Sequence, residues 1–455
     1  MPQQFTEDSD YGLAFASAFQ ATIWGYPLAI MGATSRLITQ ATEPRPNAHS
    51  PMNQLGHSTR VYTADDRDVV SPNSDTAYSS VFLDLRQGAA LFDMPEEQDR
   101  YHSLQLMDAY TNVIGYIGTR ATGGRAGRYL IVGPGWAGKI PEDIQQVFHS
   151  PTPLTWVVGR TLVDGANDVE ALVSFQKSIG LTIVGPASHP EPMWTRTGLA
   201  PLPPAPPAKQ LAAMTADGFM DWLGRLMVDN PPPEAHMAHV AQFAACGLDG
   251  QRGFSSEQLS DAARAGLQQG HASAMRSIED AAKRPAGASV NGWNQAPAAG
   301  LWGHRFAVRA MIAHRSLGQN SAQESIYLDT KTDDRDAMLD GTHTYRLRLE
   351  PNQLPPVESF WSVTAYDADN FLVPNEIDRF SLGSRSNSLR LDDDGGLTLV
   401  FSSRMPQDAK DQGNWLPTPP SGPFRLSMRL YIPSSRATSG SWVLPGLVKC
   451  APNEQ

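Results

Sequence analysis

The chain has 455 residues, a formal net charge of −11 and a sequence pI near 5.5, with 41% hydrophobic and 18% charged residues. This length predicts roughly two to four domains, and the 36 Pro and 38 Gly favour a β-rich architecture over a helical bundle. The acidic balance, without any Lys/Arg-rich run, argues against nucleic acid as the main partner, because phosphate binding needs a basic face.

The N-terminal region is predicted to be mostly helical over residues 11–37, with a kink at Gly25-Tyr26-Pro27. The apolar run Ile23–Met31 is far shorter than the roughly 20 residues that a membrane span needs. The polar, acidic stretch Met1–Asp10 lacks the positive start and apolar run of a secretory signal. We therefore expect a soluble, cytoplasmic protein with no membrane partner, or a periplasmic one if a signal has been removed.

Strands are predicted next, because apolar and polar residues alternate with period 2 in several short runs. Together with the proline-rich segment and the amphipathic helices that follow, these runs give four predicted regions. They are an N-terminal helical segment (1–58), a first β domain (59–185), a proline-rich linker with a helical region (186–335) and a second β domain (336–455). The acidic, glycine-ending stretch Asp392–Gly396 predicts a hairpin turn in the second β domain.

Two strands of the second β domain are predicted to have one polar-aromatic face each. In the run 360–366, Ser362, Thr364 and Tyr366 alternate with Trp361, Val363 and Ala365. In the run 424–431, Ser427, Arg429 and Tyr431 alternate with Leu426, Met428 and Leu430. If both apolar faces pack on one core, the polar faces could line a common cleft. A solvated sheet face is the equally weighted alternative, since antiparallel sheets often have one wet side.

A second group of polar residues lies in the first β domain. Gln105, Asp108, Tyr110, Asn112 and Arg120 fall within one short segment, and Asn73, Asp75 and Tyr78 lie upstream of it. Two carboxylates with a Tyr and an Arg could serve acid/base chemistry, with the Arg binding an anionic group. Alternatively, Asn73 and Asp75 cap a turn through bonds from side chain to backbone, and Asp108 with Arg120 forms a structural ion pair.

Cofactor signatures are weak. Gly133–Ile140 nearly matches a phosphate-binding loop, but Ile140 has no hydroxyl for Mg²⁺ and Trp136 is bulky, so we expect a turn and find no nucleotide or flavin signature. The two cysteines, Cys246 and Cys450, exclude a disulfide framework and a four-thiolate zinc site within one chain. The metal is unknown: a divalent ion held by carboxylates is left open, without a spacing signature.

The chain resembles a family that pairs the domains of unknown function numbered 1254 and 1214. The first resemblance, over residues 59–176, rests on Ser71–Tyr78, Gln105–Asn112 and Gly133–Trp136. The second, over residues 339–445, rests on Leu339–Gly341, Leu354–Ser362, Asn414–Pro417 and Arg429–Tyr431. The resemblance implies a β-rich, jelly-roll-like architecture and no known substrate. Many such proteins carry an export signal, and this sequence shows none.

We therefore expect an α+β, β-rich fold of two jelly-roll-like antiparallel β-sandwich domains with N-terminal and intervening helices. The leading hypothesis is a hydrolase or lyase that acts on a small polar, anionic or glycosidic substrate in a cleft between the β domains. The alternative is a non-catalytic binding or assembly protein of jelly-roll type. A homo-oligomer is left open, because abundant Trp and Tyr suit an interface as well as a pocket. The expected catalytic residues are Asp75, Asp108, Tyr78 and Arg120, and the expected substrate-binding residues are Asn73, Gln105, Tyr110, Asn112, Trp361, Tyr366, Trp415 and Arg429.

Overall fold

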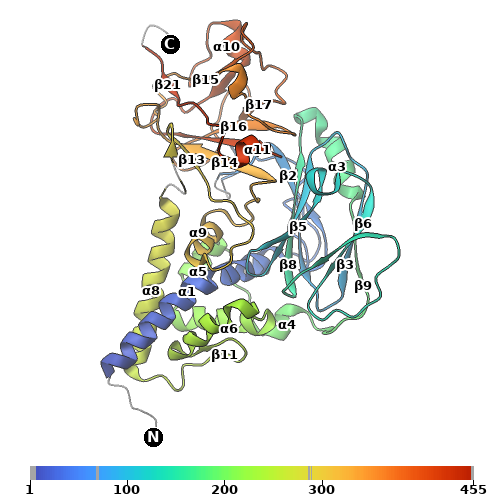
Figure 1. The fold of residues 1–455 in the computed structure, drawn as a ribbon, viewed down its shortest axis with the longest axis vertical. Helices are drawn as coiled ribbons and strands as arrows, with labels where there is room; N and C mark the ends of the chain where they lie inside the picture. The colour runs from blue at the N-terminus through green and yellow to red at the C-terminus, as the bar shows by residue number, and fades with distance from the viewer. Residues whose placement is uncertain (1–6, 68–70, 285–286, 288, 452–455) are drawn as a thin grey trace.

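The computed structural model describes residues 7–67, 71–284, 287 and 289–451, and these form three parts (Figure 1). The first β domain lies on the right of the view, the second β domain lies at the top, and a helical layer fills the lower left. The two β domains meet at the end of the first one that faces away from α4 and α6. The fold is therefore α+β and rich in sheet, as the sequence predicts.

The first β domain contains a five-stranded sheet of order β1-β2-β8-β4-β5 and a four-stranded sheet of order β7-β6-β3-β9. Its strands are β1 (Gly56–His57), β2 (Thr76–Asp84), β3 (Ala89–Met94), β4 (His102–Asp108), β5 (Val113–Gly118), β6 (Gly127–Val132), β7 (Ile144–His149), β8 (Leu154–Leu162) and β9 (Gly180–Val184). The short helices α2 (Thr119–Thr122) and α3 (Val169–Ser178) accompany them. Alternate residues of the two sheets, such as Val81 and Leu106 opposite Phe92 and Ile131, share one apolar core.

The outer face of the five-stranded sheet changes character along its length. Strands β2 and β8 pair antiparallel, which places Phe82 beside Trp156 at one end and Tyr78 beside Arg160 at the other. The stacked rings of Phe82 and Trp156 join the core of the helical layer. The Tyr78–Arg160 end continues beyond the helices toward the second β domain. One face of this sheet thus supplies both a helix-packing surface and a polar wall.

The helical layer is built around α1 (Glu7–Ile38), which is almost completely buried over its second half. The other helices are α4 (Met193–Thr197), α5 (Pro207–Ala212), α6 (Ala216–Asp229), α7 (Met237–Val240), α8 (Asp261–Lys283) and α9 (Phe306–Ser316), with the small hairpin β10 (Leu248–Asp249) and β11 (Gly253–Phe254). The side chains of Thr215 and Ser260 cap α6 and α8, as expected for hydroxyl residues at helix starts.

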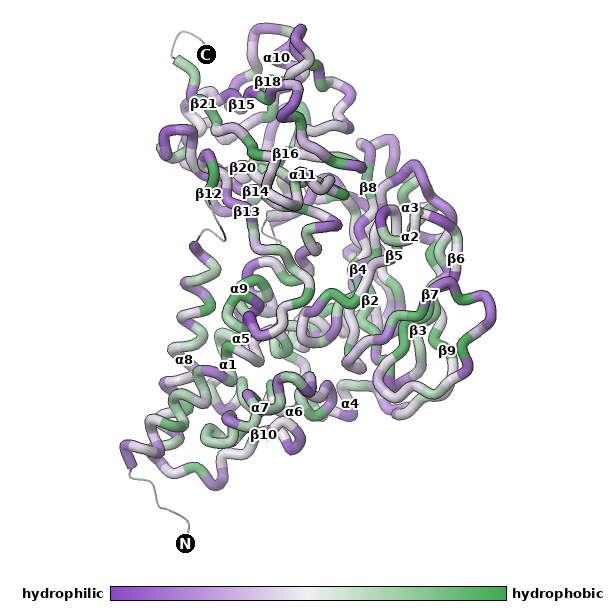
Figure 2. Tube along the Cα trace, viewed as in Figure 1, coloured by the Kyte–Doolittle hydropathy of each residue, from purple (hydrophilic) through white to green (hydrophobic). Residues whose placement is uncertain are grey.

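Helix α1 covers the whole region 11–37 that is predicted to be helical, and it extends well beyond the apolar run Ile23–Met31 at both ends. It continues through Pro27, the position at which the sequence predicts a kink. By length and composition alone it could cross a membrane, but 72% of its most apolar window is buried within the protein. Figure 2 shows apolar residues of α1 among those of α5 and α6, where it packs as a core helix.

The second β domain contains a six-stranded sheet of order β12-β13-β14-β20-β16-β17 and a four-stranded sheet of order β19-β18-β15-β21. Its elements are β12 (Ser289–Val290), β13 (Trp293–Gln295), β14 (Ser325–Thr330), β15 (Tyr345–Leu349), β16 (Trp361–Tyr366), β17 (Ser381–Gly383), β18 (Leu397–Ser402), α10 (Ala409–Gly413), β19 (Trp415–Pro417), β20 (Arg425–Tyr431), α11 (Ser435–Thr438) and β21 (Val448–Lys449). Both sheets contribute to one core. The predicted start at residue 336 is too late, because β14 is already a central strand.

Two details of the predicted sheets are wrong. The pairing is not antiparallel throughout, since β6 with β7 and β18 with β19 are parallel. The acidic stretch does form a turn, in which the Asp392 amide donates to the Gly396 carbonyl at 2.8 Å. That turn does not close a hairpin, because β18 pairs with β15 and β19 and not with the strand before the turn.

Candidate functional site

The polar face of the six-stranded sheet forms one side of the site. Strands β16 and β20 pair so that Ser362 lies opposite Arg429 and Thr364 opposite Ser427. Their apolar residues, among them Val363 and Met428, lie in the core, so the predicted division of these two strands into faces is confirmed. Arg429 donates from Nη1 to Thr364 Oγ1 at 2.7 Å and from Nη2 to the Tyr366 hydroxyl at 2.5 Å. The guanidinium is thereby fixed across the sheet face.

The loop before β2 brings the first β domain onto this face. The Tyr366 hydroxyl donates to the Pro72 carbonyl at 2.7 Å, and Asn73 Nδ2 donates to the Tyr431 hydroxyl at 2.8 Å. Asn73 Oδ1 also accepts the Asp75 amide at 2.8 Å, which is the local turn bond that its side chain favours. The predicted residues Asn73, Tyr366 and Arg429 are therefore brought together, although Asn73 lies more than 280 positions before the other two in the chain.

Asp75 lies in the same contact region. Its Oδ2 accepts the Ser362 hydroxyl at 2.5 Å and lies 3.5 Å from the Tyr431 hydroxyl. Burial, together with the Asp75 charge, holds the pKa of Tyr431 well above its ordinary range. Tyr431 is therefore a neutral hydrogen-bond donor at neutral pH, which suits a position beside a carboxylate.

Arg160 supplies the opposite side of the site from β8. Its Nη1 donates to Gln105 Oε1 at 3.1 Å and to Asn320 Oδ1 at 2.9 Å, and its Nη2 donates to the Gly318 carbonyl at 2.5 Å. The guanidinium lies 5.7 Å from the centre of the Tyr78 ring. Gln105, predicted to bind substrate, thus holds Arg160 in place and does not itself line the cavity.

A cavity of about 340 Å³ lies between these two sides and the end of α9. Its wall includes four arginines and one carboxylate: Arg160, Arg315, Arg425, Arg429 and Asp329. Tyrosine rings and hydroxyl or amide groups supply much of the remainder, from Tyr62, Tyr78, Tyr327, Ser71, Asn73 and Ser427. Burial raises the pKa of Tyr78 and raises that of Tyr62 to about 12, so both phenols are neutral at pH 7.

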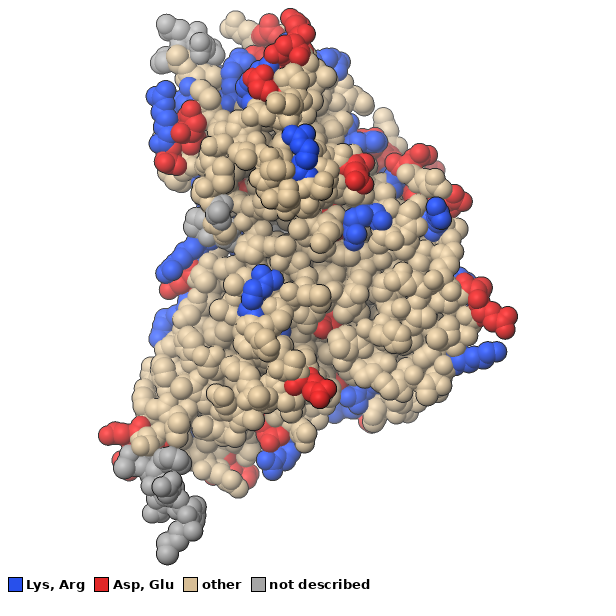
Figure 3. All heavy atoms as spheres, viewed as in Figure 1, with Lys and Arg blue, Asp and Glu red and all other residues tan. Residues whose placement is uncertain are grey.

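The charge of this cavity is unusual because two of its arginines are buried without a carboxylate partner. Arg160 is 6% exposed and Arg429 is 5% exposed. Within the described residues both bind only neutral acceptors, whereas Arg425 pairs with Asp329 at 2.9 Å. Most charged side chains in Figure 3 instead lie at the outer edges of the molecule and over the second β domain. A buried cation is costly unless an anion or hydrogen bonds compensate it, so this cavity is suited to an anion.

A larger groove of about 840 Å³ lies on the other side of the Asn73–Asp75 segment. Asp75 and Ser362 line this groove, whereas Asn73 lines the cavity, and Tyr62 lines both. The segment is therefore the wall between the two hollows, and the Asp75 carboxylate lies on the groove side of that wall.

Asp108 is not part of the site. It pairs with Thr155 on β8, whereas Thr76, beside Asp75, pairs with Leu162, seven residue steps away (155 to 162). At about 3.4 Å per step, this separates the two carboxylates by roughly 20 Å or more. Asp108 instead caps a turn, accepting the amides of Tyr110 and Asn112 and the Asn112 side chain. The predicted Asp75–Asp108 acid/base pair is therefore wrong, and so is the alternative in which Asp108 pairs with Arg120, because Arg120 binds Glu324.

Arg120 and the predicted substrate-binding residues near Asp108 also have structural partners. Arg120 Nε donates to Glu324 Oε2 at 2.6 Å, so it joins the two β domains and does not pair with Asp108. The Tyr110 hydroxyl donates to the Asn230 carbonyl, and its ring packs against Trp24 in the helical layer. Asn112 holds the Asp108 turn. None of these residues lines the cavity or the groove.

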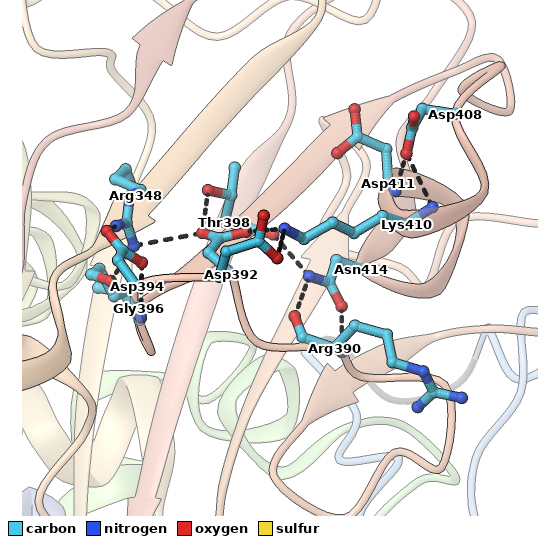
Figure 4. Close-up of polar contacts among 12 residues, drawn as sticks. Arg348, Arg390, Asp392, Asp394, Gly396, Thr398, Asp408, Lys410, Asp411 and Asn414 are labelled. Carbon is cyan, nitrogen blue, oxygen red and sulfur yellow. Dashed lines mark hydrogen bonds and ion pairs between the residues drawn. The ribbon is translucent and has the colours of Figure 1, made fainter.

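The two tryptophans predicted to bind substrate, Trp361 and Trp415, do not line the cavity. Trp361 belongs to the core of the second β domain and reaches only the groove. Trp415 donates to the Ser402 carbonyl at 2.9 Å, next to the polar cluster drawn in Figure 4. In that cluster Asn414 joins two segments by binding the Arg390 backbone and the Thr398 carbonyl, and Lys410 pairs with Asp392 at 3.0 Å. The Asn414–Pro417 motif is thus structural.

Several cavity residues were missed from the sequence, namely Arg160, Arg425, Tyr327 and Asp329. For the two arginines a signal was present: Arg160 continues the Trp156–Val158 face of its strand, and Arg425 shares the Ser427–Arg429 face. Tyr327 and Asp329 lie on β14, which was not predicted. The sequence leaves open whether a metal ion is bound. Among the described residues, no group of three or more His, Cys, Asp or Glu could hold one.

Comparisons with known proteins agree with the two-domain organisation. Residues 52–183 match the family "Protein of unknown function (DUF1254)" and residues 324–435 match "Protein of unknown function (DUF1214)". No curated protein matches the chain. The crystal structure of the VPA0106 protein from Vibrio parahaemolyticus shares the fold, with a TM-score of 0.69 and 20% identity over 96% of this chain and 100% of that one. An uncharacterized protein from Burkholderia cenocepacia gives a TM-score of 0.46 and 13% identity over 97% of this chain and 96% of that one. This chain belongs to the family that pairs a DUF1254 domain with a DUF1214 domain.

Proposed function

We propose that this protein is an enzyme, a hydrolase or lyase, that binds a small anionic substrate in the cavity between its β domains. The observation that carries the proposal is the pair of buried arginines, Arg160 and Arg429, that face this cavity without a carboxylate partner among the described residues. An anionic group on the substrate would accept hydrogen bonds from those N–H groups of Arg160 and Arg429 that donate to no acceptor among the described residues. Ligand sites commonly combine such a concave wall with a few converging polar groups.

The proposed chemistry uses groups at the edge of this cavity. Tyr78 presents a neutral phenol beside Arg160 and would act as proton donor. Asp75, held by Ser362 and close to Tyr431 on the groove side of the wall, would not contact a substrate in the cavity; it would position the wall through Tyr431 and Asn73. Tyr366 would position Arg429 and does not touch the substrate itself.

The test is a turnover screen with purified protein. Pools of sugar acids, phosphate esters and small carboxylic acids are incubated in H₂¹⁸O and followed by mass spectrometry. A hydrolase gives a product that contains ¹⁸O, and a lyase gives two products whose masses sum to that of the substrate. Tyr78→Phe should abolish turnover and leave substrate affinity within a few-fold of the native value, with Arg128→Gln, at the surface of the first β domain, as the unaffected control.

A non-catalytic binding or assembly protein with jelly-roll connectivity is the second candidate. One observation favours it: the described carboxylate in the cavity wall, Asp329, is already engaged by Arg425 and Arg315. In this case a ligand would bind and be recovered unchanged from every pool. Light scattering would then show whether assembly into a homo-oligomer accompanies binding. Binding without turnover of any retained compound would contradict the enzyme proposal.

A further inference from the structure

We infer that the molecule bound in the cavity carries two negative charges, as a phosphate monoester or a dicarboxylate does. This inference rests on the proposed function and specifies its substrate class. It follows from the number, position and bonding of the charges around the cavity.

The charge count gives a surplus of two. Four arginines line the cavity, and the Asp329 carboxylate lies 2.9 Å from Arg425 and 3.4 Å from Arg315, so it compensates one charge of that pair. Asp75, behind the wall, lowers the local positive charge by one more. Two positive charges remain without a counter-charge among the described residues. A monoanion would compensate only one of them, and a dianion would compensate both.

The bonding of the two unpaired arginines leaves donors for a ligand. A guanidinium has five N–H groups. Arg160 uses three of these on neutral acceptors, and Arg429 uses two. Both side chains are held in fixed positions by these bonds, so they are preorganised for an anion and lose little conformational freedom on binding.

The two arginines come from different domains. Arg160 lies on β8 of the first β domain and Arg429 on β20 of the second, and both line the cavity together with Tyr78. One phosphate group or two carboxylates could therefore bind both. Arg425, by contrast, is occupied: it binds Asn370, Asp329 and Ser71, and its guanidinium lies 4.2 Å from the centre of the Tyr366 ring. We assign it a role in shaping the wall.

The rest of the wall sets the size and surface of the molecule. The cavity volume of about 340 Å³ suits a compound of metabolite size, and the rings of Tyr62, Tyr78 and Tyr327 offer flat surfaces to its carbon skeleton. Phosphate monoesters and dicarboxylates share the required charge, so the experiment separates them.

The experiment is isothermal titration calorimetry with two matched pairs of probes at constant ionic strength and pH 7.5. Phenyl phosphate is compared with phenyl sulfate, which has nearly the same shape and one charge. Succinate is compared with its monomethyl ester. Native protein, Arg160→Gln, Arg429→Gln and the surface control Arg128→Gln are each titrated, and circular dichroism and thermal unfolding confirm that every variant is folded. Arg160→Lys and Arg429→Lys, which keep the charge, are added if a Gln variant does not fold.

We expect at least one dianion to bind native protein and Arg128→Gln about tenfold or more tightly than its monoanionic partner. Each Gln variant should reduce that preference to less than about threefold. The pair that shows the preference identifies the phosphate or the dicarboxylate class. Equal binding of monoanion and dianion, with loss of both in the Gln variants, would overturn the dianion inference and leave the anion site intact. Absence of binding by all four probes, or binding that the Gln variants do not change, would overturn both.

Discussion

Asp108→Asn tests the structural role that the fold gives to a residue that the sequence placed in catalysis. Asp108 is 2% exposed and accepts the amides of Tyr110 and Asn112 at 2.9 and 2.8 Å and the Asn112 side chain at 2.9 Å. Burial raises the pKa of its carboxyl from 3.8 to about 6, although these donors act in the opposite direction. The substitution removes the titrating group and keeps the shape of the side chain.

The magnitude follows from that difference in pKa. Because the folded protein keeps this proton to a higher pH than the unfolded chain, ionisation of Asp108 opposes folding. A rise in pKa from 3.8 to about 6 corresponds to about 3 kcal/mol, because each tenfold change in proton affinity is worth about 1.4 kcal/mol. The free energy of unfolding of the native protein should therefore fall, relative to that of Asp108→Asn, by about 3 kcal/mol as the pH rises from about 4 to about 7.

The assay is urea unfolding of both proteins, followed by tryptophan fluorescence at several pH values across this range. Asp143→Asn is the matched control. Asp143 is exposed and its pKa is lowered by Arg128, so any slope that it contributes has the opposite sign. A free energy of unfolding of the native protein that, measured relative to that of Asp108→Asn, stays constant or increases as the pH rises would contradict this prediction. Loss of ligand affinity in Asp108→Asn with unchanged stability would return this residue to the site.

The other predictions concern contacts that hold the domains and loops in place. Glu324→Gln removes the charge that binds Arg120 Nε at 2.6 Å and accepts the Tyr101 hydroxyl at 2.9 Å; we expect a loss of about 2–4 kcal/mol in urea unfolding, with probe affinity unchanged. Asn414→Ala deletes three hydrogen bonds to Arg390 and Thr398 and should lower the free energy of unfolding by about 2–3 kcal/mol, and a loss below about 0.5 kcal/mol would show that the loop does not depend on it. Gly341→Ala would place a methyl group 1.9 Å from the Pro419 carbonyl oxygen, so it should destabilise by about 2 kcal/mol or more in thermal unfolding. Gly12→Ala, in a helix with open space around the residue, is its control and should be neutral or stabilising.

Local patterns in the sequence were sufficient for the elements that carry the site. Alternation in the runs 360–366 and 424–431 placed Ser362, Thr364 and Arg429 on one face, because side chains of a strand point alternately to opposite sides. The amphipathic helices expected within residues 186–335 likewise include α6, on which Phe219 and Leu226 are buried. In these cases the physical cause lies within a few residues of the chain.

The parts that failed depend on partners far away in the sequence. Asp75 and Asp108 are close in the chain, but the antiparallel pairing of β2 and β4 with β8 carries them to opposite ends of one sheet. Arg120 pairs with Glu324, 204 positions away, and no local pattern indicates that contact. Strand β14 was missed although it is as long as β16 and its core residues Ile326 and Leu328 alternate with Tyr327 and Asp329, which were missed with it.

The claim that the cavity between the β domains is an anion site is tested most directly by locating an anion in crystals. Bromide is small enough to enter the cavity, so the test does not depend on the carbon skeleton of the natural ligand. Its anomalous scattering distinguishes it from water. We expect a strong anomalous peak within about 3.5 Å of the Arg160 or Arg429 guanidinium, and its loss in crystals of Arg429→Gln. Bromide ions bound only on the outer surface, with the cavity free of them in native crystals, would contradict it.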